Sequence, residues 1–186
     1  MDALVKSDLY RATGEVTGKA FFKRLLKDPC FRFLFFFRKV QKTSKISPAG
    51  FFYHLLFRRY GIKYGIQIPK TVVIGKGFLM LHEGGIVINA QSIIGDNVTL
   101  LHGVTLGNTK RGKLQGTPTI GNNVYIGPGA VIVGKVRVGD HSLIAPNSYV
   151  NCDVPDHSIA IGNPCQIISK QNASDGYINN PYEQEI

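Results

Sequence analysis

The hydrophobic residues that follow residue 66 recur with a period of six. From Ile68 the chain reads IPKTVV, IGKGFL and MLHEGG, and after a two-residue slip between residues 86 and 94 it continues INAQSI, IGDNVT and LLHGVT. From Ile120 the rhythm resumes through IGNNVY, IGPGAV, IVGKVR, VGDHSL, IAPNSY and VNCDVP. A helix requires apolar spacings of three and four, and simple alternation gives no sixfold register. The pattern therefore predicts a solenoid of very short strands, in which each coil buries its aliphatic residues against the next.

The pattern before residue 66 is typical of helices. Residues 18–60 carry closely spaced Phe, Leu, Lys and Arg instead of hexads. Ser47 followed by Pro48 is a common helix start, and Gly61 is a stop signal. We therefore expect a basic helical region over residues 1–66, a solenoid over 67–168 that a loop at 107–118 interrupts, and a loose polar tail over 169–186.

Composition and charge narrow the class of protein. Of the 186 residues, 44% are hydrophobic and 18% charged, which excludes a disordered chain. All of the net charge of +10 falls in residues 1–66, which carry 14 Lys and Arg against 4 Asp and Glu and hold 10 of the 11 Phe. Three Cys without a CxxC spacing argue against a disulfide framework or a zinc ribbon. There is no apolar run of about 18 residues and no signal-peptide pattern, so we expect a cytoplasmic protein.

Three segments of the solenoid resemble the hexapeptide-repeat acyltransferases, in particular their serine acetyltransferase branch. They are GIQIPKTVVIGKGFLMLHEGGIVIN, IIGDNVTLLHGVTLGNT and PTIGNNVYIGPGAVIVGKVRVGDHSLIAPNS, and the ending VPDHSIAIGNPCQII is similar to the last coil of that branch and of sugar acetyltransferases. The resemblance covers about residues 65–168. It implies a mainly β fold, a left-handed parallel β-helix with three-sided coils. It also implies acetyl-CoA as the donor and a homotrimer whose active sites lie between subunits.

His82 and His102 both occupy the third position of a hexad. Their separation of 20 residues equals one coil of 18 plus the slip. We therefore expect the two imidazoles to stack on one edge, on strands roughly 4.8 Å apart. Pro128 and Pro146 continue the same edge. A solvated surface histidine is the ordinary alternative for either residue.

The resemblance places a catalytic base at His82. A neutral imidazole accepts a hydroxyl proton near neutral pH, and the alcohol then attacks the thioester of acetyl-CoA while an N–H donor stabilises the oxyanion. Three roles stay open for His102: that donor, a contact to the acceptor, or the base itself.

The acceptor is predicted from departures from the serine acetyltransferase pattern. The resemblance implies an orienting Asp where this chain has Gln67, an acid where it has Leu81, and an Arg-His pair where it has Gly116 and Thr117. A charged amino acid would lose these counter-charges, and an unpaired buried charge is costly.

Because HGVTLGN preceded by HEGGIVIN is closer to the capsule and colanic-acid type enzymes, we expect the acceptor to be a sugar hydroxyl of a surface polysaccharide or its precursor. The alternatives are a serine acetyltransferase with altered recognition and a non-catalytic, membrane-associated scaffold. The candidate acceptor contacts are Gln67, Glu83, Arg111 and Thr117.

The interruption after Leu106 is expected to protrude from the solenoid. It forms either a solvated turn or, as in similar enzymes, a flap whose cations face an anionic cofactor. No metal is expected, because His141 lies on another side of the coil and the close histidine pair of zinc-binding relatives is missing. The residues assigned to acetyl-CoA are Gly107, Lys110, Pro128, Gly129, Ala130, Pro146 and Lys170.

The basic N-terminal region, residues 1–66, has three interpretations. Its helices either pack on the β-helix and cap the first coil, or lie on an anionic membrane, at the inner membrane surface, through residues 18–60. Nucleic-acid binding is the third, and the pI of about 9.6 is high enough for it. No nucleic-acid motif is present, so we expect no such partner. The first two interpretations stay open, because opposite faces of one helix can serve both.

Overall fold

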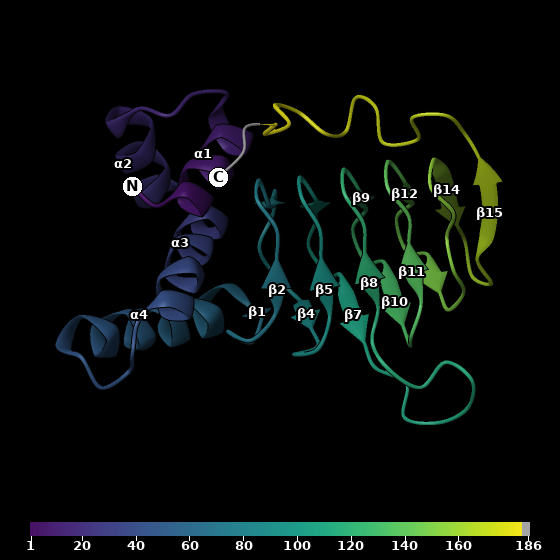
Figure 1. Ribbon diagram of the computed structural model, residues 1–186, viewed down its shortest axis with the longest axis horizontal. Helices are drawn as coiled ribbons and strands as arrows, with labels where there is room; N and C mark the ends of the chain where they lie inside the picture. The colour runs from purple at the N-terminus through teal and green to yellow at the C-terminus, as the bar shows by residue number, and fades with distance from the viewer. Residues whose placement is uncertain (184–186) are drawn as a thin grey trace.

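The computed structural model describes residues 1–183, as a small helical bundle joined end-on to a stack of very short strands (Figure 1). The helices are α1 (Ala3–Thr13), α2 (Gly18–Lys27), α3 (Pro29–Lys42) and α4 (Pro48–Tyr64). The strands are β1 (Ile66–Gln67), β2 (Val73–Ile74), β3 (Leu79–Met80), β4 (Ile86–Ile88), β5 (Ile93–Ile94), β6 (Thr99–Leu100), β7 (Thr105–Gly107), β8 (Thr119–Ile120), β9 (Tyr125–Ile126), β10 (Val131–Val133), β11 (Arg137–Val138), β12 (Leu143–Ile144), β13 (Tyr149–Val150), β14 (Ser158–Ile161) and β15 (Gln166–Ser169).

A capping side chain fixes the start of each helix. Its oxygen accepts a backbone N–H of the first turn, a donor that the helix itself leaves unpaired. The four caps are Asp2, Thr17, Asp28 and Ser47. Among residues 1–183, no helix is both long enough and apolar enough to span a membrane.

The end of α4 differs from the sequence prediction. The start at Ser47 is confirmed, but the stop at Gly61 is wrong, because the helix continues to Tyr64. The ring of Tyr64 stacks on that of Tyr60 with centroids 5.5 Å apart, and this contact stabilises the additional turn. The helix ends at Gly65, whose φ of 62° is left-handed backbone that glycine adopts without strain.

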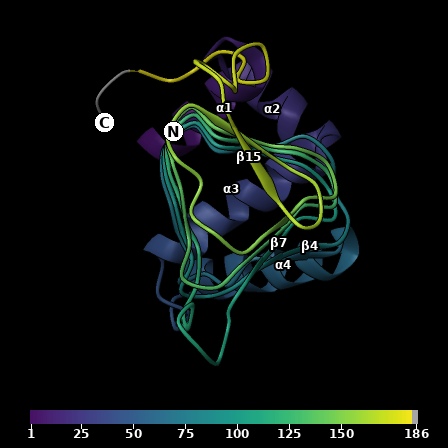
Figure 2. The same ribbon diagram turned by 90° about the vertical axis from the view of Figure 1, so that its right-hand side faces the viewer.

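The strands form three parallel sheets in which paired neighbours are three strands apart along the chain, except that β14 pairs with β12. The sheets run β1-β4-β7-β10-β13, β2-β5-β8-β11 and β3-β6-β9-β12-β14, and β15 joins the last as an antiparallel strand. Each coil thus gives one strand to each of three faces, and Figure 2 shows the triangular outline. Residues that open the hexads, such as Ile94, Ile120 and Ile126, are buried inside. The predicted short strands with inward aliphatic rows are confirmed.

The pairing register locates the two irregularities of the repeat. Partners are 20 residues apart between β3 and β6 but 18 apart between β4 and β7. The two extra residues therefore lie in the bend between β3 and β4, and not after residue 86 as predicted. Gly84 and Gly85, with φ of 108° and 65°, allow this wider bend. The later insertion follows β7 and forms the expected loop, which projects from the stack over residues 108–118 (Figure 1).

α3 covers the open end of the first coil and closes the hydrophobic core. Phe33 and Phe37 are at most 1% exposed and belong to one cluster with Ile66, Val72 and Phe78 of that coil. Each buried ring stabilises the fold by about 1.5–3 kcal/mol. The interpretation that the N-terminal region caps the first coil is therefore confirmed for α3.

A buried ion pair fastens the helices to the bend between β2 and β3. Arg38 of α3 donates to both carboxylate oxygens of Asp8 of α1, at 2.9 and 3.1 Å. Arg38 also donates to the backbone oxygens of Ile74 (2.7 Å) and Gly75 (2.6 Å), and Asp8 accepts the N–H of Phe78 at 3.0 Å. Both side chains are only 1% exposed, so these bonds offset the cost of burying two charges.

The segment after β15 is an ordered strap, which we define as residues 170–182. It runs back along the stack from the last coil to α1 (Figures 1 and 2). Ala173 is buried, the ring of Tyr177 lies 4.5 Å from that of Tyr125, and the N–H of Tyr182 donates to Asn97 Oδ1 at 2.8 Å. The prediction of a loose tail is wrong for residues 170–182, because these contacts hold them against the stack. The partners are single side chains distant in sequence, so no local pattern reveals them. Residues 184–186 of the predicted tail lie outside the described residues.

Arg38→Met is expected to lower the free energy of unfolding by about 3–5 kcal/mol, because it leaves Asp8 as an unpaired buried carboxylate. Urea unfolding followed by circular dichroism measures the change. Arg137→Met is the control, because Arg137 pairs with Asp156 at 3.4 Å on the surface, where an ion pair contributes less than about 1 kcal/mol. Equal effects of the two substitutions would contradict a fastening role for Arg38.

Candidate active site

His82 and His102 lie side by side on one edge of the stack. Met80 pairs in register with Leu100, so the histidines two residues further on are in register as well. Their ring centroids are 5.8 Å apart and the planes are inclined by 76°, edge to face. Both side chains are exposed, and within residues 1–183 no hydrogen bond holds either ring. The predicted stacking is confirmed, and the ring nitrogens are accessible to a ligand. We call the line of His82, His102, Pro128 and Pro146 the His edge.

The residue that follows His102, and the one that follows each later position of the His edge, has a left-handed backbone conformation that turns the chain. Gly103, Gly129 and Asn147 have φ of 71°, 70° and 56°. The N–H of Gly129 donates to the His102 oxygen at 3.0 Å, which ties the histidine to the next coil. A Cβ on Gly103 would lie 3.3 Å from the Gly129 Cα, so glycine permits the close approach of coils that holds the edge straight.

The residues assigned to acetyl-CoA divide between the His edge and other places. Pro128, Gly129 and Pro146 follow His102 along the edge. Ala130 departs from the prediction, because it is 0% exposed and belongs to the hydrophobic core. Gly107 ends β7 on the neighbouring face, one strand beyond the edge.

The three cations assigned to acetyl-CoA or the acceptor lie at other corners of the triangular stack. The loop of residues 108–118 leaves the stack between the face of β7 and the face of β8, and it holds Lys110 and Arg111 exposed. Lys170 lies at the third corner, where its N–H donates to the His157 oxygen at 2.9 Å. Within one chain, the backbone does not bring these residues to His82.

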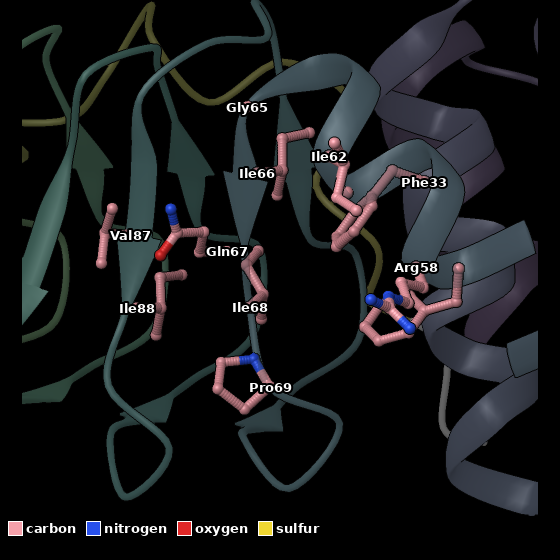
Figure 3. A pocket seen from close by; sticks show the side chains of 12 residues that line it. Phe33, Arg58, Ile62, Gly65, Ile66, Gln67, Ile68, Pro69, Val87 and Ile88 are labelled. Atoms are coloured by element: carbon pink, nitrogen blue, oxygen red, sulfur yellow. The ribbon is translucent and has the colours of Figure 1, made fainter. Parts of the chain in front are cut away.

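The remaining predicted acceptor contacts are also dispersed. Gln67 stands on the outer side of β1 and lines an apolar cleft of about 580 Å³ between α4 and the first coil (Figure 3). The hydroxyl of Thr117 donates to the Gln91 oxygen at 3.1 Å, beside the loop. Of the predicted contacts, Glu83 adjoins His82 directly.

A polar groove of about 690 Å³ lies between the His edge and the helical bundle. Leu81 and Glu83, the two neighbours of His82, form one wall, and Lys23 and Lys27 of α2 form the opposite wall. The groove is thus lined by the two chain neighbours of His82 and not by His82 itself. It joins residues that are about 60 positions apart in the sequence.

The groove carries charges of both signs. Burial raises the pKa of the Cys30 thiol to about 12, and the carboxylates of Asp28 and Glu83 add to this shift, which places Glu83 near the start of α3. Within residues 1–183, no acidic side chain pairs with Lys23 or Lys27. The sequence does not reveal Lys23 and Lys27 as candidate site residues, because their spacing of four shows that they share a helix face but not that this face meets the His edge.

His141 lies at the corner between β11 and β12, apart from the His edge, as predicted. Its ring stacks on that of His157, with centroids 5.0 Å apart and planes inclined by 4°. Among residues 1–183, no three His, Cys, Asp or Glu side chains are grouped to hold a metal ion.

Residues 117–152 match the family described as bacterial transferase hexapeptide (six repeats). The serine acetyltransferase of Helicobacter pylori is 42% identical over 106 residues, which are 57% of this chain and 62% of that protein. Soybean serine acetyltransferase complexed with serine superposes with a TM-score of 0.73 at 31% identity, covering 89% of this chain and 68% of that one. The Brucella abortus serine acetyltransferase in complex with coenzyme A gives a TM-score of 0.74 at 28% identity, covering 90% and 67%.

The chain belongs to the hexapeptide-repeat transferase family, and its fold is the left-handed β-helix of that family preceded by helices. The chain spans less than two thirds of the length of the curated relatives it matches, with shares of 30%, 37% and 62% for three of them.

The prediction of a sugar acceptor in polysaccharide synthesis is wrong. Relatives that are 37–42% identical over 105–112 residues are serine acetyltransferases. The prediction took Leu81, Gly116 and Thr117 as the loss of every counter-charge for an amino acid, and it did not consider charges outside the β-helix, such as those of Lys23 and Lys27 in α2.

Proposed function

We propose that this chain transfers the acetyl group of acetyl-CoA to the hydroxyl of serine. The observation that carries the proposal is the His82–His102 pair, exposed on an edge of the hexapeptide fold beside a groove with both signs of charge. Solved relatives support the donor and the acceptor, since one is in complex with coenzyme A and another with serine. The proposal keeps the enzyme class and the donor that the sequence predicts and replaces the acceptor.

His82 acts as the general base in this proposal. The serine hydroxyl gives its proton to a ring nitrogen of His82 while its oxygen bonds to the carbonyl carbon of the thioester. The resulting oxyanion accepts a hydrogen bond from His102 or from a backbone N–H of the edge. The C–S bond then breaks, and the departing thiolate of coenzyme A takes the proton from the imidazolium. The reaction returns His82 to its neutral form.

The polar groove suits a zwitterionic acceptor. Glu83 offers a carboxylate for the ammonium of serine, and Lys23 and Lys27 offer cations for its carboxylate. Glu83 follows His82 directly in the chain, so the proposal places the hydroxyl of an amino acid bound at Glu83 next to the base. These contacts stand in for the counter-charges that are missing at Leu81, Gly116 and Thr117.

We extend the proposal to a homotrimer. The His edge and the loop of residues 108–118 lie at different corners of one chain, so a flap role for Lys110 and Arg111 requires the loop of a neighbouring subunit. A closed threefold assembly supplies such a neighbour to each of its sites.

The purified protein is expected to release coenzyme A from acetyl-CoA when L-serine is present. A thiol reagent measures the release, and mass spectrometry identifies O-acetylserine. L-Alanine, which lacks the hydroxyl, is the control for hydrolysis. A protein that binds coenzyme A by calorimetry yet releases no more thiol with serine than with alanine would overturn the acceptor.

His82→Asn is expected to lower kcat by ~10²–10⁴-fold, because the substituted side chain cannot take up the hydroxyl proton. His102→Asn, measured in parallel, shows which histidine is the base, since loss of an oxyanion donor alone costs less when a backbone donor remains. His141→Asn is the matched control at another corner, where asparagine tolerates the φ of 54°. Near-normal kcat in a folded His82→Asn protein would contradict the assignment.

Replacement of Lys23 and Lys27 together by alanine is expected to raise KM for serine about tenfold, since two exposed charge contacts contribute ~1–2 kcal/mol. KM for acetyl-CoA stays unchanged in steady-state assays. Lys6→Ala, on the exposed side of α1, is the control for a general change of charge. An equal rise in KM for both substrates would assign the lysines to the cofactor instead.

A further inference from the structure

The outer face of α4 exposes large apolar side chains. Phe51, Leu55 and Ile62 are 60%, 54% and 73% exposed, and with Arg58 they form one stripe at spacings of four, three and four residues. Phe52, beside this stripe, is 54% exposed. Single exposed apolar residues are ordinary on a protein surface, whereas a contiguous row marks an interaction site.

The inner face of the same helix already makes the contacts that capping requires. Phe57 packs on Phe33 of α3 with ring centroids 5.2 Å apart, and Tyr60 packs on Phe36 at 5.4 Å. The helix is therefore held by its inner aromatic residues. Its outer apolar residues have no apolar partner from another helix or strand in the part of the chain that the structure describes.

The charges on the outer face are all positive. Arg58, Arg59 and Lys63 are exposed, and α4 contains no Asp or Glu. Within residues 1–183, no acidic side chain pairs with these three cations. We define the α4 face as Phe51, Phe52, Leu55, Arg58, Arg59, Ile62 and Lys63.

The acidic residues elsewhere in the helical bundle do not compensate this charge. Asp2 pairs with Lys42, Asp8 with Arg38 and Asp28 with Arg24. Three of the four carboxylates in residues 1–66 are thus already engaged. The excess of positive charge in this region is therefore available to an external anionic partner.

The apolar area continues from the α4 face onto the first coil. Arg58 and Ile62 stand at one side of the apolar cleft, and Pro69, Val87 and Ile88 stand at the other (Figure 3). Among the described residues that line this cleft, Arg58 alone is charged. An apolar surface bordered by cations alone matches the boundary between lipid headgroups and acyl chains.

We propose that the α4 face docks the protein onto an anionic phospholipid bilayer. The Phe, Leu and Ile side chains enter the headgroup boundary, and Arg58, Arg59 and Lys63 contact the lipid phosphates. Charge decides between this occupant and the α4 face of a second copy of the chain. Two α4 faces placed together would oppose six cations without one acid, whereas an anionic surface strengthens binding roughly fivefold for each cation.

The test is sedimentation of the full chain with vesicles of phosphatidylcholine alone or mixed equally with phosphatidylglycerol, at low and high salt. We expect binding to the mixed vesicles, and weaker binding at high salt. The triple substitution R58Q, R59Q and K63Q is expected to weaken this binding by roughly 100-fold. The matched control removes three cations from the projecting loop, as K110Q, R111Q and K113Q, and retains most of the binding.

A second variant separates the apolar contribution from the charge. L55S with I62S is expected to weaken binding to the mixed vesicles as well, and to leave its salt dependence intact. Thermal unfolding verifies that each variant is folded.

Several outcomes overturn the proposal. These are equal binding to both kinds of vesicle, an equal loss in the loop control, and equally strong binding to a DNA duplex. An α4 variant that lowers the mass in light scattering, in a protein that binds no vesicles, assigns the face to a second copy. None of these measurements depends on the acceptor of the acetyl group.

Discussion

A single coil of this protein has no hydrophobic core of its own. Its inward-facing aliphatic side chains are buried only by those of the coils before and after it. This constraint explains why the inward positions are almost uniformly aliphatic and why the ends need covers. α3 supplies the first cover through Phe33 and Phe37. The Asp8–Arg38 pair then keeps α1 and α3 in place over the bend between β2 and β3. The hydrophobic stack and the polar clamp at its end form one structural unit.

The same constraint confines variation to the corners. Residues on the flat faces must stay in register with both neighbours, but a bend can take additional residues without disturbing a strand pair. The bend that contains His82 is two residues longer than its successor, the loop after β7 is longer still, and the strap runs past the third corner. Each corner therefore carries a different feature, and the candidate chemistry lies at a corner because the faces have no freedom to build it.

The sequence predicts the positions of residues that the six-residue repeat determines. It brings His82 and His102 together because, in a repeat, a separation along the chain translates directly into a distance between coils. It places Pro128 and Pro146 on the same edge for the same reason. It does not predict what lies outside the period. The continuation of α4 to Gly65 depends on the stacking of Tyr64 on Tyr60, and the groove depends on how Lys23 and Lys27 meet Glu83. These contacts join segments that share no common pattern.

The strap changes how such a stack comes apart. A linear array of repeats frays from its ends, because a terminal coil has one neighbour instead of two. Here Tyr177 contacts the third face, while Tyr182 reaches Asn97 and the ring of Tyr10 in α1. Residues beyond the last strand are thus held by the helix that also fastens the first coil. Because opening either end disturbs contacts made by the other, we expect the strap to couple the melting of the two ends of an otherwise one-dimensional molecule.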